Sequence, residues 1–312
     1  MRLFLGIDAG GTGSRYALVD EGAHVLASGE GGPIQAAQLA PVEVAAALRV
    51  LAARAGVGPE CLVAGLAGAG DPATRRAIET ALAQQGLACP ARIVGDVEVG
   101  AAAALADGPG VAAYAGTGSF VVARAAEGGL HRVGGRGWLL GDEGSAFDLV
   151  RHAAIAVLRA HDGLGPATAL TAVLVRASGA PSADRVGAAL QRLAPREVAA
   201  LLPHVLGVAG AGDAVATGVL ADRMQALAEL VSAAARRAGL DLATVPVVAG
   251  GGVLEPDGPV REAFAAALRA RGGPRGPGAP RFSAAEGAAR LALALARHEP
   301  PLSRWVDDGR TP

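Results

Sequence analysis

The sequence predicts an α/β protein made of two domains of similar design. A loop rich in glycine and hydroxyl side chains occurs twice, at residues 9–14 and 115–119, and each copy lies between two predicted β-strands. Strand and helix patterns alternate along the chain, and its 312 residues are enough for two domains of ordinary size. The repeat carries most weight, because internal similarity indicates that a structural unit is duplicated.

The first cycle of elements is predicted from periodicity and turn residues. Leu3, Leu5 and Ile7 alternate with residues of the opposite face, as the side chains of a strand do. Pro41 suits the first turn of a helix that Gly56 ends. The expected elements in this half are strands over 3–8, 15–20, 24–28, 61–66 and 91–95 and helices over 41–56, 71–85 and 99–106.

A second cycle of elements follows. Glycine turns separate the expected strands, and a run of helices extends from Asp142 to Ala238. Ser283 and Glu286 stand before an apolar run with the spacing of a capping box, which marks a helix N-terminus. The expected elements here are strands over 110–115, 120–125 and 245–249, helices within 142–238 and a last helix over 283–297.

Composition and charge argue against several classes of protein. The formal net charge is -1, so no global field favours nucleic acid or an anionic membrane. Two cysteines, Cys61 and Cys89, cannot form a disulfide framework or a four-cysteine zinc site within one chain. Gly, Pro or charged residues interrupt every apolar run before it could span a bilayer, and Asp8 comes too early for a signal peptide. We therefore expect a cytoplasmic protein that binds neither nucleic acid nor membrane.

The two repeated loops suit the binding of a nucleotide triphosphate. Glycine lets backbone N–H groups approach phosphate oxygens without an intervening Cβ, and threonine and serine add hydroxyl donors. An ordinary glycine hairpin explains either loop alone, but both together, with Asp8 before the first, favour phosphate binding. Neither loop has the Walker pattern or leads from a strand into a helix, which disfavours P-loop and Rossmann sites. The candidate phosphate-binding residues are Gly10, Gly11, Thr12, Gly13, Ser14, Gly116, Thr117, Gly118 and Ser119.

Two aspartates at strand ends are candidates for the chemistry of phosphoryl transfer. Asp8 closes the first strand beside the first loop, where phosphates would repel a carboxylate unless a cation lies between them. Mg²⁺, held directly or through water, is therefore expected at Asp8. Asp96 follows the strand over 91–95 and suits a general base that accepts a proton from an attacking hydroxyl. The same position also suits an ordinary helix cap, and Glu98 is a nearby competitor for the base.

A glycine-rich stretch over 134–145 surrounds Trp138 and ends in an Asp-Glu-Gly-Ser run that begins at Asp142. Its acids suit a helix N-terminus, whose dipole favours negative charge. They also suit a loop whose carboxylate accepts hydrogen bonds from sugar hydroxyls, and both roles can hold at once. The three glycines at 250–252 follow an apolar strand and would let a flat purine lie against the backbone, although a bare turn explains this pattern too.

Taken in order, these segments resemble the N-acetylglucosamine kinase and glucosamine kinase family, also called the BadF/BadG/BcrA/BcrD ATPase family. That family belongs to the actin, Hsp70 and hexokinase superfamily. The phosphate loops are shared by the superfamily, whereas the Gly-Trp and Gly-Asp-Glu-Gly-Ser stretch at 137–145 is much more specific to the family. The matching stretches, which span nearly the whole chain in family order, are residues 6–14, 65–68, 95–96, 115–119, 134–145, 250–253 and 285–289.

The resemblance implies two ribonuclease-H-like domains of the actin-like ATPase type, with mixed five-stranded sheets flanked by helices. A cleft between them would close around ATP, Mg²⁺ and an amino sugar. The last helix would return to the first domain, so the expected domains are 1–107 with 283–298, and 108–282. Relatives are often dimers, and an alanine-rich helical face of the second domain would form a homodimer interface.

The resemblance also implies roles for individual residues. Asp96 would be the general base toward the sugar 6-hydroxyl, Asp8 would lie near Mg²⁺, and Gly251 and Gly252 would border the adenosine. The candidate sugar-binding residues are Gln35, Gly68, Asp96, Phe120, Trp138 and Asp142. We therefore expect ATP-dependent phosphorylation of N-acetylglucosamine or glucosamine, and the choice between these sugars stays open.

Departures from the family pattern fall on the sugar side. Gln35 stands where many relatives have asparagine, and Gly95 replaces the usual asparagine or threonine before Asp96. Phe120 follows the second loop where animal relatives have asparagine. A partner-activating ATPase of the iron–sulfur type is one alternative, but the cysteines that would hold its cluster are missing. A sugar sensor that has kept the fold is another, which Gln35 and Phe120 keep open.

Overall fold

The computed structural model describes residues 1–11, 13–56, 58–105, 108–297 and 304–305. Within them the chain divides into two compact units. The first contains residues 1–108, 126–130 and those from 280 on, and the second contains 109–125 and 131–279. Four predicted features lie outside the described residues: Thr12 of the first loop, Ala106 at a predicted helix end, and the domain limits at 107 and 298.

The first sheet is mixed and has the strand order β3-β2-β1-β4-β5. Its strands are β1 (Phe4–Ala9), β2 (Ser14–Val19), β3 (Val25–Gly31), β4 (Cys61–Leu66) and β5 (Ala91–Gly95). β1 pairs antiparallel with β2 and parallel with β4, and β5 is parallel to β4. The carboxyl ends of β1, β4 and β5 therefore meet at one edge, where the first glycine loop also lies.

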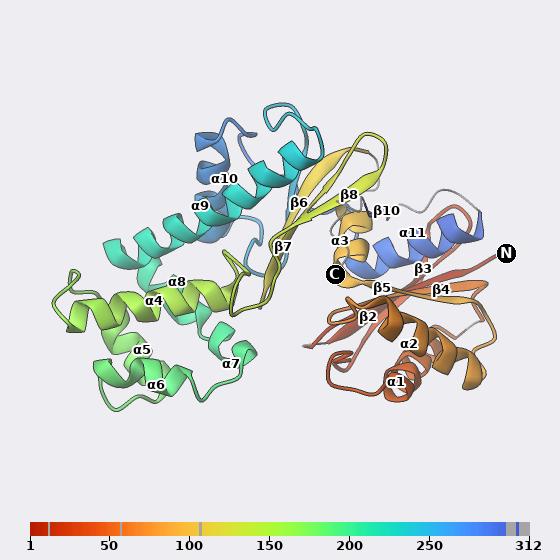
Figure 1. The fold of residues 1–312 in the computed structure, drawn as a ribbon, viewed down its shortest axis with the longest axis horizontal. Coiled ribbons are helices and arrows are strands. Elements are labelled where there is room, and N and C mark those ends of the chain that lie inside the picture. Colours follow the sequence, from red (N-terminus) through yellow and green to blue (C-terminus); the bar gives the residue numbers. More distant parts are fainter. Residues whose placement is uncertain (12, 57, 106–107, 298–303, 306–312) are drawn as a thin grey trace. The chain divides into compact units, whose positions relative to one another are not determined.

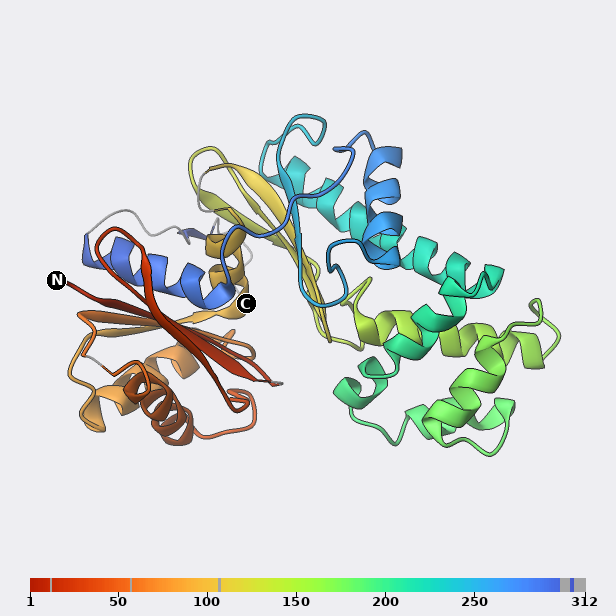
Figure 2. The same cartoon turned by 180° about the vertical axis from the view of Figure 1, so that it is seen from behind.

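Helices cover both faces of this sheet (Figures 1 and 2). α1 (Pro41–Ala53) and α2 (Pro72–Gln84) lie on one face, and α3 (Asp96–Ala104) and α11 (Ala284–Ala296) lie on the other. The alternation predicted for β1 is confirmed. Leu5 and Ile7 belong to the apolar cluster that contains α1 and α2 residues, whereas Phe4 belongs to the cluster that contains α11 residues. The sheet thus has a core on each side.

The C-terminal helix α11 packs closely on β1. The predicted capping box at its start is confirmed, because the hydroxyl of Ser283 accepts the N–H of Glu286 and the Glu286 carboxylate accepts the N–H of Ser283. α11 then passes so near β1 that a Cβ on Gly6 would overlap backbone atoms of Ala285 and Ala289. A larger side chain at Gly6 would displace the helix, so this glycine is required by the contact.

The second sheet is also mixed and five-stranded, in the order β10-β8-β7-β6-β9. Its strands are β6 (Gly110–Ala115), β7 (Ser119–Arg124), β8 (Gly129–Val133), β9 (Val247–Gly250) and β10 (Arg304–Trp305). β6 pairs antiparallel with β7 and parallel with β9. The β6–β7 hairpin therefore repeats the β1–β2 hairpin, with the second glycine loop between its strands.

α-Helices outnumber strands in the second unit. They are α4 (Ala146–His161), α5 (Leu170–Ser178), α6 (Val186–Leu190), α7 (Pro195–Ala199), α8 (Leu202–Gly210), α9 (Ala214–Arg237) and α10 (Pro259–Ala270). The long helix α9 packs against β6 and β7 and against α4, α8 and α10 (Figure 1). The predicted α/β class, with two mixed five-stranded sheets flanked by helices, is confirmed. Among the described residues, no helix combines the length and apolar character that crossing a membrane requires.

Several element boundaries differ from the prediction, and the starts of α3 and β9 are two of them. α3 begins at Asp96 and not at Val99, because Gly95 is already the extended N-cap residue and acidic side chains in the first turn favour the helix dipole. β9 begins at Val247 and not at Val245, because Pro246 has no N–H to donate to a neighbouring strand. Asp96 is therefore the first residue of a helix and not part of a loop before it.

Replacing Gly6 by alanine should lower the free energy of unfolding by about 3 kcal/mol or more, because the new Cβ would overlap the backbone of α11. Urea denaturation followed by circular dichroism measures the change. Gly70→Ala is the matched control: Gly70 borders open space and has no left-handed conformation, so the effect should stay within about 1 kcal/mol. Equal losses in the two variants would contradict the close contact.

Candidate functional site

A pocket of about 510 Å³ opens in the first unit at the carboxyl end of β1. Its walls come from the first glycine loop, β3 and the start of α3. The lining residues are Asp8, Ala9, Gly10, Gly13, Ser14, Arg15, Glu30, Gly31, Ala67 and Asp96. The pocket therefore brings together the expected magnesium residue, the expected general base and part of the first expected phosphate loop.

Charged side chains form a row across the sheet at this pocket. The strand register places Asp8 opposite Arg15, and Arg15 opposite Glu30. Opposed residues on neighbouring strands carry their side chains on the same face. The Arg15 guanidinium lies 3.1 Å from a Glu30 carboxylate oxygen at a largely exposed position. Asp96 approaches the pocket from the other side, because α3 begins where β5 ends.

Asp8 and Asp96 are half-buried acids that interact electrostatically. Burial is the main reason that the pKa of Asp8 rises to about 6. The nearby Asp96 carboxylate contributes to the rise, and the Arg15 guanidinium opposes it. A bound cation would relieve both causes, because it compensates for lost hydration and separates the two negative charges.

The donors at this pocket fit an Mg²⁺ ion that a nucleotide helps to hold. Within the described part of the chain, no group of three or more Asp, Glu, His and Cys side chains could form a metal cage. Mg²⁺ in phosphate sites usually takes only one or two carboxylates, and water and phosphate oxygens complete its coordination. Asp8, with Asp96 nearby, matches that smaller donor set.

Hydrogen bonds close the first glycine loop and join it to the segment that follows β3. The N–H of Gly10 donates to the carbonyl of Gly13 at 3.0 Å, and the carbonyl of Gly10 accepts the N–H of Ile34 at 3.0 Å. The hydroxyl of Ser14 donates to the carbonyl of Gly32 at 2.8 Å. The loop is therefore tied at two points to the segment that follows β3.

Two of the expected sugar-binding residues lie around this same segment. Gln35 is next to Gly11, because a Cβ on Gly11 would be 3.9 Å from the Gln35 Cγ. Gly68 has a φ of +84°, and a Cβ there would lie 2.9 Å from the Cβ of Ala37. The first unit therefore places Gln35 against the first loop and Gly68 against the segment that carries Gln35.

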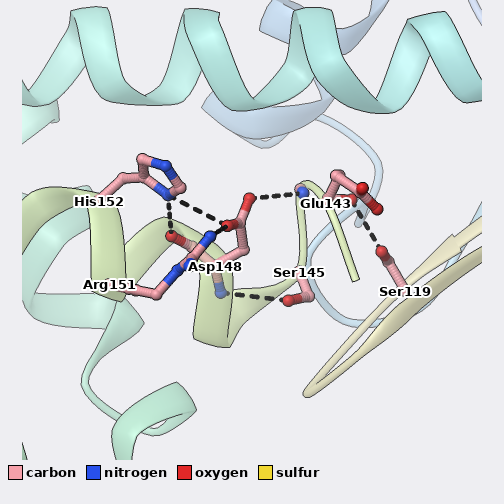
Figure 3. Close-up of polar contacts among 7 residues, drawn as sticks. Ser119, Glu143, Ser145, Asp148, Arg151 and His152 are labelled. Carbon is pink, nitrogen blue, oxygen red and sulfur yellow. Dashed lines mark hydrogen bonds and ion pairs between the residues drawn. The ribbon is translucent and has the colours of Figure 1, made fainter. Parts of the chain in front are cut away.

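The second glycine loop has a matching arrangement. The N–H of Gly116 donates to the carbonyl of Gly118 at 2.8 Å. The hydroxyl of Ser119, which is 4% exposed, donates to the carbonyl of Glu143 at 2.7 Å (Figure 3). The carbonyl of Gly116 accepts the N–H of Ala146 at the start of α4. Each repeated loop thus ends in a serine whose hydroxyl bonds a later segment of the same unit.

Asp142 lies against the second loop. Its carboxylate accepts the backbone N–H groups of Gly137, at 3.1 Å, and of Ser119, and the residue is 9% exposed. A Cβ on Gly118 would lie only 2.6 Å from Asp142 Oδ2. Burial raises the pKa of Asp142 and the Glu143 carboxylate adds to the rise, whereas the two N–H groups oppose it. An expected sugar-binding acid is therefore joined to an expected phosphate loop.

Asp148 fixes the Asp-Glu-Gly-Ser turn, and the sequence motifs did not single it out (Figure 3). Its buried carboxylate accepts the N–H of Gly144 at 3.0 Å and a guanidinium N–H of Arg151 at 2.9 Å, and it lies 3.1 Å from the His152 ring. Although burial opposes the change, bonds from His152, Gly144 and Arg151 lower the pKa of Asp148. A serine followed three positions later by an acid, ahead of an apolar run, is the helix-start pattern that could have revealed it.

The other expected residues of the second loop region are more accessible. Phe120 is half-buried and stacks on Tyr114 with ring centroids 5.2 Å apart. Trp138 is 47% exposed and meets Phe147 edge-on, with centroids 5.3 Å apart. Thr117, in the middle of the loop, is exposed. These side chains are therefore able to meet a ligand.

The glycine turn at 250–252 packs against the end of β6. Gly251 has a φ of +89°, and a Cβ there would overlap the carbonyl of Ala115. The same carbonyl accepts the N–H of Val253 at 3.0 Å. Gly252 is exposed. Because Ala115 is the first residue of the second glycine loop, the second unit joins the expected adenosine turn to that loop.

Replacing Asp8 by asparagine should stabilise the nucleotide-free protein at pH 8. The folded state raises the pKa of Asp8 to about 6, so its contribution to stability is present below the unfolded pKa and is lost as the pH rises through about 6. We expect a gain in unfolding free energy of about 1–2 kcal/mol at pH 8 that disappears near pH 4. Urea denaturation at both pH values measures it.

Asp20→Asn, in the turn between β2 and β3, is the control. Asp20 accepts the N–H groups of His24 and Gly22, and these bonds lower its pKa, so removing its charge should destabilise the protein at pH 8. A destabilised Asp8→Asn protein at pH 8, or a gain of the same size at pH 4, would contradict the raised pKa of Asp8.

Two curated relatives match part of this chain. The N-acetyl-D-glucosamine kinase of Dictyostelium discoideum is 34% identical over 157 residues, which are 48% of this chain and 48% of the relative. The N-acetylmuramic acid/N-acetylglucosamine kinase of Clostridium acetobutylicum is 30% identical over 178 residues, which are 54% of this chain and 58% of the relative. The chain thus spans about half the length of the curated relatives that it matches.

A solved structure and a family model match more of the chain. The structure of a candidate N-acetylglucosamine kinase from Chromobacterium violaceum is 25% identical, with 94% of this chain and 99% of that chain covered and a TM-score of 0.73. This likeness and the two sheet orders confirm the expected actin-like ATPase fold. The model of the BadF/BadG/BcrA/BcrD ATPase family matches residues 5–292. The resemblance inferred from the motifs is confirmed, and the protein belongs to the BadF/BadG/BcrA/BcrD ATPase family.

Proposed function

We propose that this protein transfers the γ-phosphoryl group of ATP to an amino sugar, with N-acetylglucosamine as the first candidate and the 6-hydroxyl as the acceptor. The observation that carries the proposal is the pocket that Asp8 and Asp96 line together with the first glycine loop. Family membership and the kinase names of the curated relatives support it. Phosphoryl transfer depends on positioning and on compensation of charge, and this pocket offers groups for both.

The nucleotide side of the proposal rests on the two glycine loops. Their backbone N–H groups would bind phosphates, Gly251 and Gly252 would border the adenosine, and Asp8 would hold Mg²⁺ directly or through water. When bound, Mg²⁺ neutralises charge on the phosphate oxygens during the transfer. Arg15 adds positive charge to the same wall, and its exposed pair with Glu30 is weak enough to be exchanged for a phosphate.

Asp96 is better placed than Glu98 to act as the general base. Asp96 lines the pocket from the first turn of α3. Glu98 is 3% exposed and accepts a hydrogen bond from Arg75 at 2.8 Å. Its carboxylate is therefore buried inside the unit and already bonded. A base has to reach the hydroxyl group that it deprotonates, which favours Asp96.

The sugar would contact residues that lie beside the phosphate loops. These are Gln35 and Gly68 in the first unit and Phe120, Trp138 and Asp142 in the second. The names of both curated relatives favour an N-acetylated sugar over free glucosamine. Gln35 keeps the amide of the asparagine that many relatives carry, so it can both donate to and accept from sugar hydroxyls. The expected homodimer and the domain limits at 107 and 282 stay predictions.

ADP release in a coupled assay tests the proposal. N-acetylglucosamine with ATP and Mg²⁺ should give turnover, and EDTA should abolish it, because the phosphates would lose their cation. The 6-deoxy form of the same sugar should give none, since it lacks the acceptor hydroxyl. N-acetylmuramic acid, glucosamine and glucose complete the panel. No ADP release with any sugar would contradict the kinase and favour a sugar sensor.

Asp96→Asn should lower kcat by about 10²–10⁴-fold and leave the Kd of ATP nearly unchanged, because an amide cannot accept the proton of the attacking hydroxyl. Steady-state kinetics and titration calorimetry measure the two quantities. Glu98→Gln is the control: the amide oxygen can still accept from Arg75, so kcat should stay within about tenfold of the wild type. Near-normal turnover by Asp96→Asn would show that Asp96 is not the general base.

A further inference from the structure

Arg261 joins two backbone segments of the second unit. From α10, its Nη1 donates to the carbonyls of Ala249, at 3.2 Å, and Leu254, at 2.8 Å. Its Nη2 donates to the carbonyls of Pro277, at 2.7 Å, and Gly278, at 2.8 Å. The Arg261 side chain therefore bonds both ends of the turn at 250–252, through Ala249 and Leu254. It also bonds the loop after α10 that contains Pro277 and Gly278.

The loop that Arg261 reaches extends the sheet beside β9. The N–H of Ala249 donates to the carbonyl of Gly278 at 2.9 Å, and the N–H of Gly278 donates to the carbonyl of Val247 at 2.8 Å. The carbonyl of Gly278 thus accepts from both Ala249 and Arg261. Backbone hydrogen bonds hold this loop beside β9, and the hydrogen bonds of Arg261 connect the glycine turn to it.

The turn is held from its other side by β6. Gly251 packs on the carbonyl of Ala115, and that carbonyl also accepts the N–H of Val253. Ala115 begins the second glycine loop, which has hydrogen bonds of its own, from Gly116 to Gly118 and from Ala146 to Gly116. Loss of Arg261 should therefore loosen the turn at 250–252 more than the phosphate loop.

Arginine suits this task because of its shape. The guanidinium is planar and directs its N–H donors outward in a rigid fork, so it can serve two segments at once. All four acceptors are neutral carbonyl oxygens, and the positive charge of the donor strengthens each bond. A lysine ammonium is a single point of attachment and cannot reproduce this bridge.

We infer that Arg261 is a positioning residue for the adenosine site, which it supports by holding the turn at 250–252 in the conformation that accepts a purine nucleoside. This inference rests on the proposed nucleotide binding. The turn at 250–252 would contact the nucleoside part of the nucleotide, and the glycine loops would bind the phosphates.

Calorimetric titration of three variants with three probes tests the inference. The probes are adenosine, ADP and inorganic tripolyphosphate, each with Mg²⁺. R261M should raise the Kd of adenosine and of ADP by the same factor, about tenfold or more, and leave the Kd of tripolyphosphate within about twofold. R261K should show a smaller rise for the same two probes. R269M is the matched control on α10, because Arg269 makes one bond to the carbonyl of Arg275, and all three Kd values should stay unchanged.

Each result separates this role from a merely structural one. Equal weakening of all three probes by R261M would show a general loss of structure and would overturn the inference. If R261M does not fold, R261K decides: wild-type affinity for adenosine would overturn the inference, and a selective loss with faster hydrogen exchange at 250–254 would support it. A wild-type protein that binds neither adenosine nor ADP would overturn the nucleotide site itself, whatever the variants do.

Discussion

The pocket at the end of β1 keeps the carboxylates of Asp8 and Asp96 away from full hydration and close enough to repel each other. The rest of the first unit is arranged around this constraint. The loop glycines leave N–H groups without side-chain bulk, Arg15 stands opposite Asp8 on the next strand, and α3 directs its positive end to the pocket. A site that disfavours a bare negative charge favours a cation and a polyanion that arrive together.

The two glycine loops share a bond that links two regions inside each unit. Ser14 donates to Gly32 in the segment that carries Gln35, and Ser119 donates to Glu143 in the Asp-Glu-Gly-Ser turn. Under the proposed function, each bond runs from a phosphate loop to a segment that contacts the sugar. A phosphate that shifts either loop would therefore also shift a sugar contact of the same unit. The duplication thus includes this bond as well as the glycines.

Local patterns in the sequence were sufficient where periodicity or a cap decides the structure. The strand at 110–115 and the capping box of Ser283 are examples. Contacts between distant segments were not predictable in this way, because they depend on packing. The partner of the Ser14 hydroxyl, the register that places Arg15 beside Asp8, and the four carbonyls around Arg261 all come from segments that no local pattern brings together. For the same reason the motifs favoured phosphate donation by Ser14 and did not indicate any role for Arg261.

The tight contact between Gly6 and α11 also affects how the chain folds during its synthesis. Phe4 and Val63 on one face of the first sheet are buried with Ala288 and Leu291 of α11, which a ribosome adds only after the whole second unit. At ~5–20 residues per second, the stretch between β5 and α11 takes on the order of 10–40 s to synthesise. Throughout that interval the part of this apolar sheet face that α11 covers stays exposed on the nascent chain. Capture by chaperones and aggregation then compete with the final closure of the first unit.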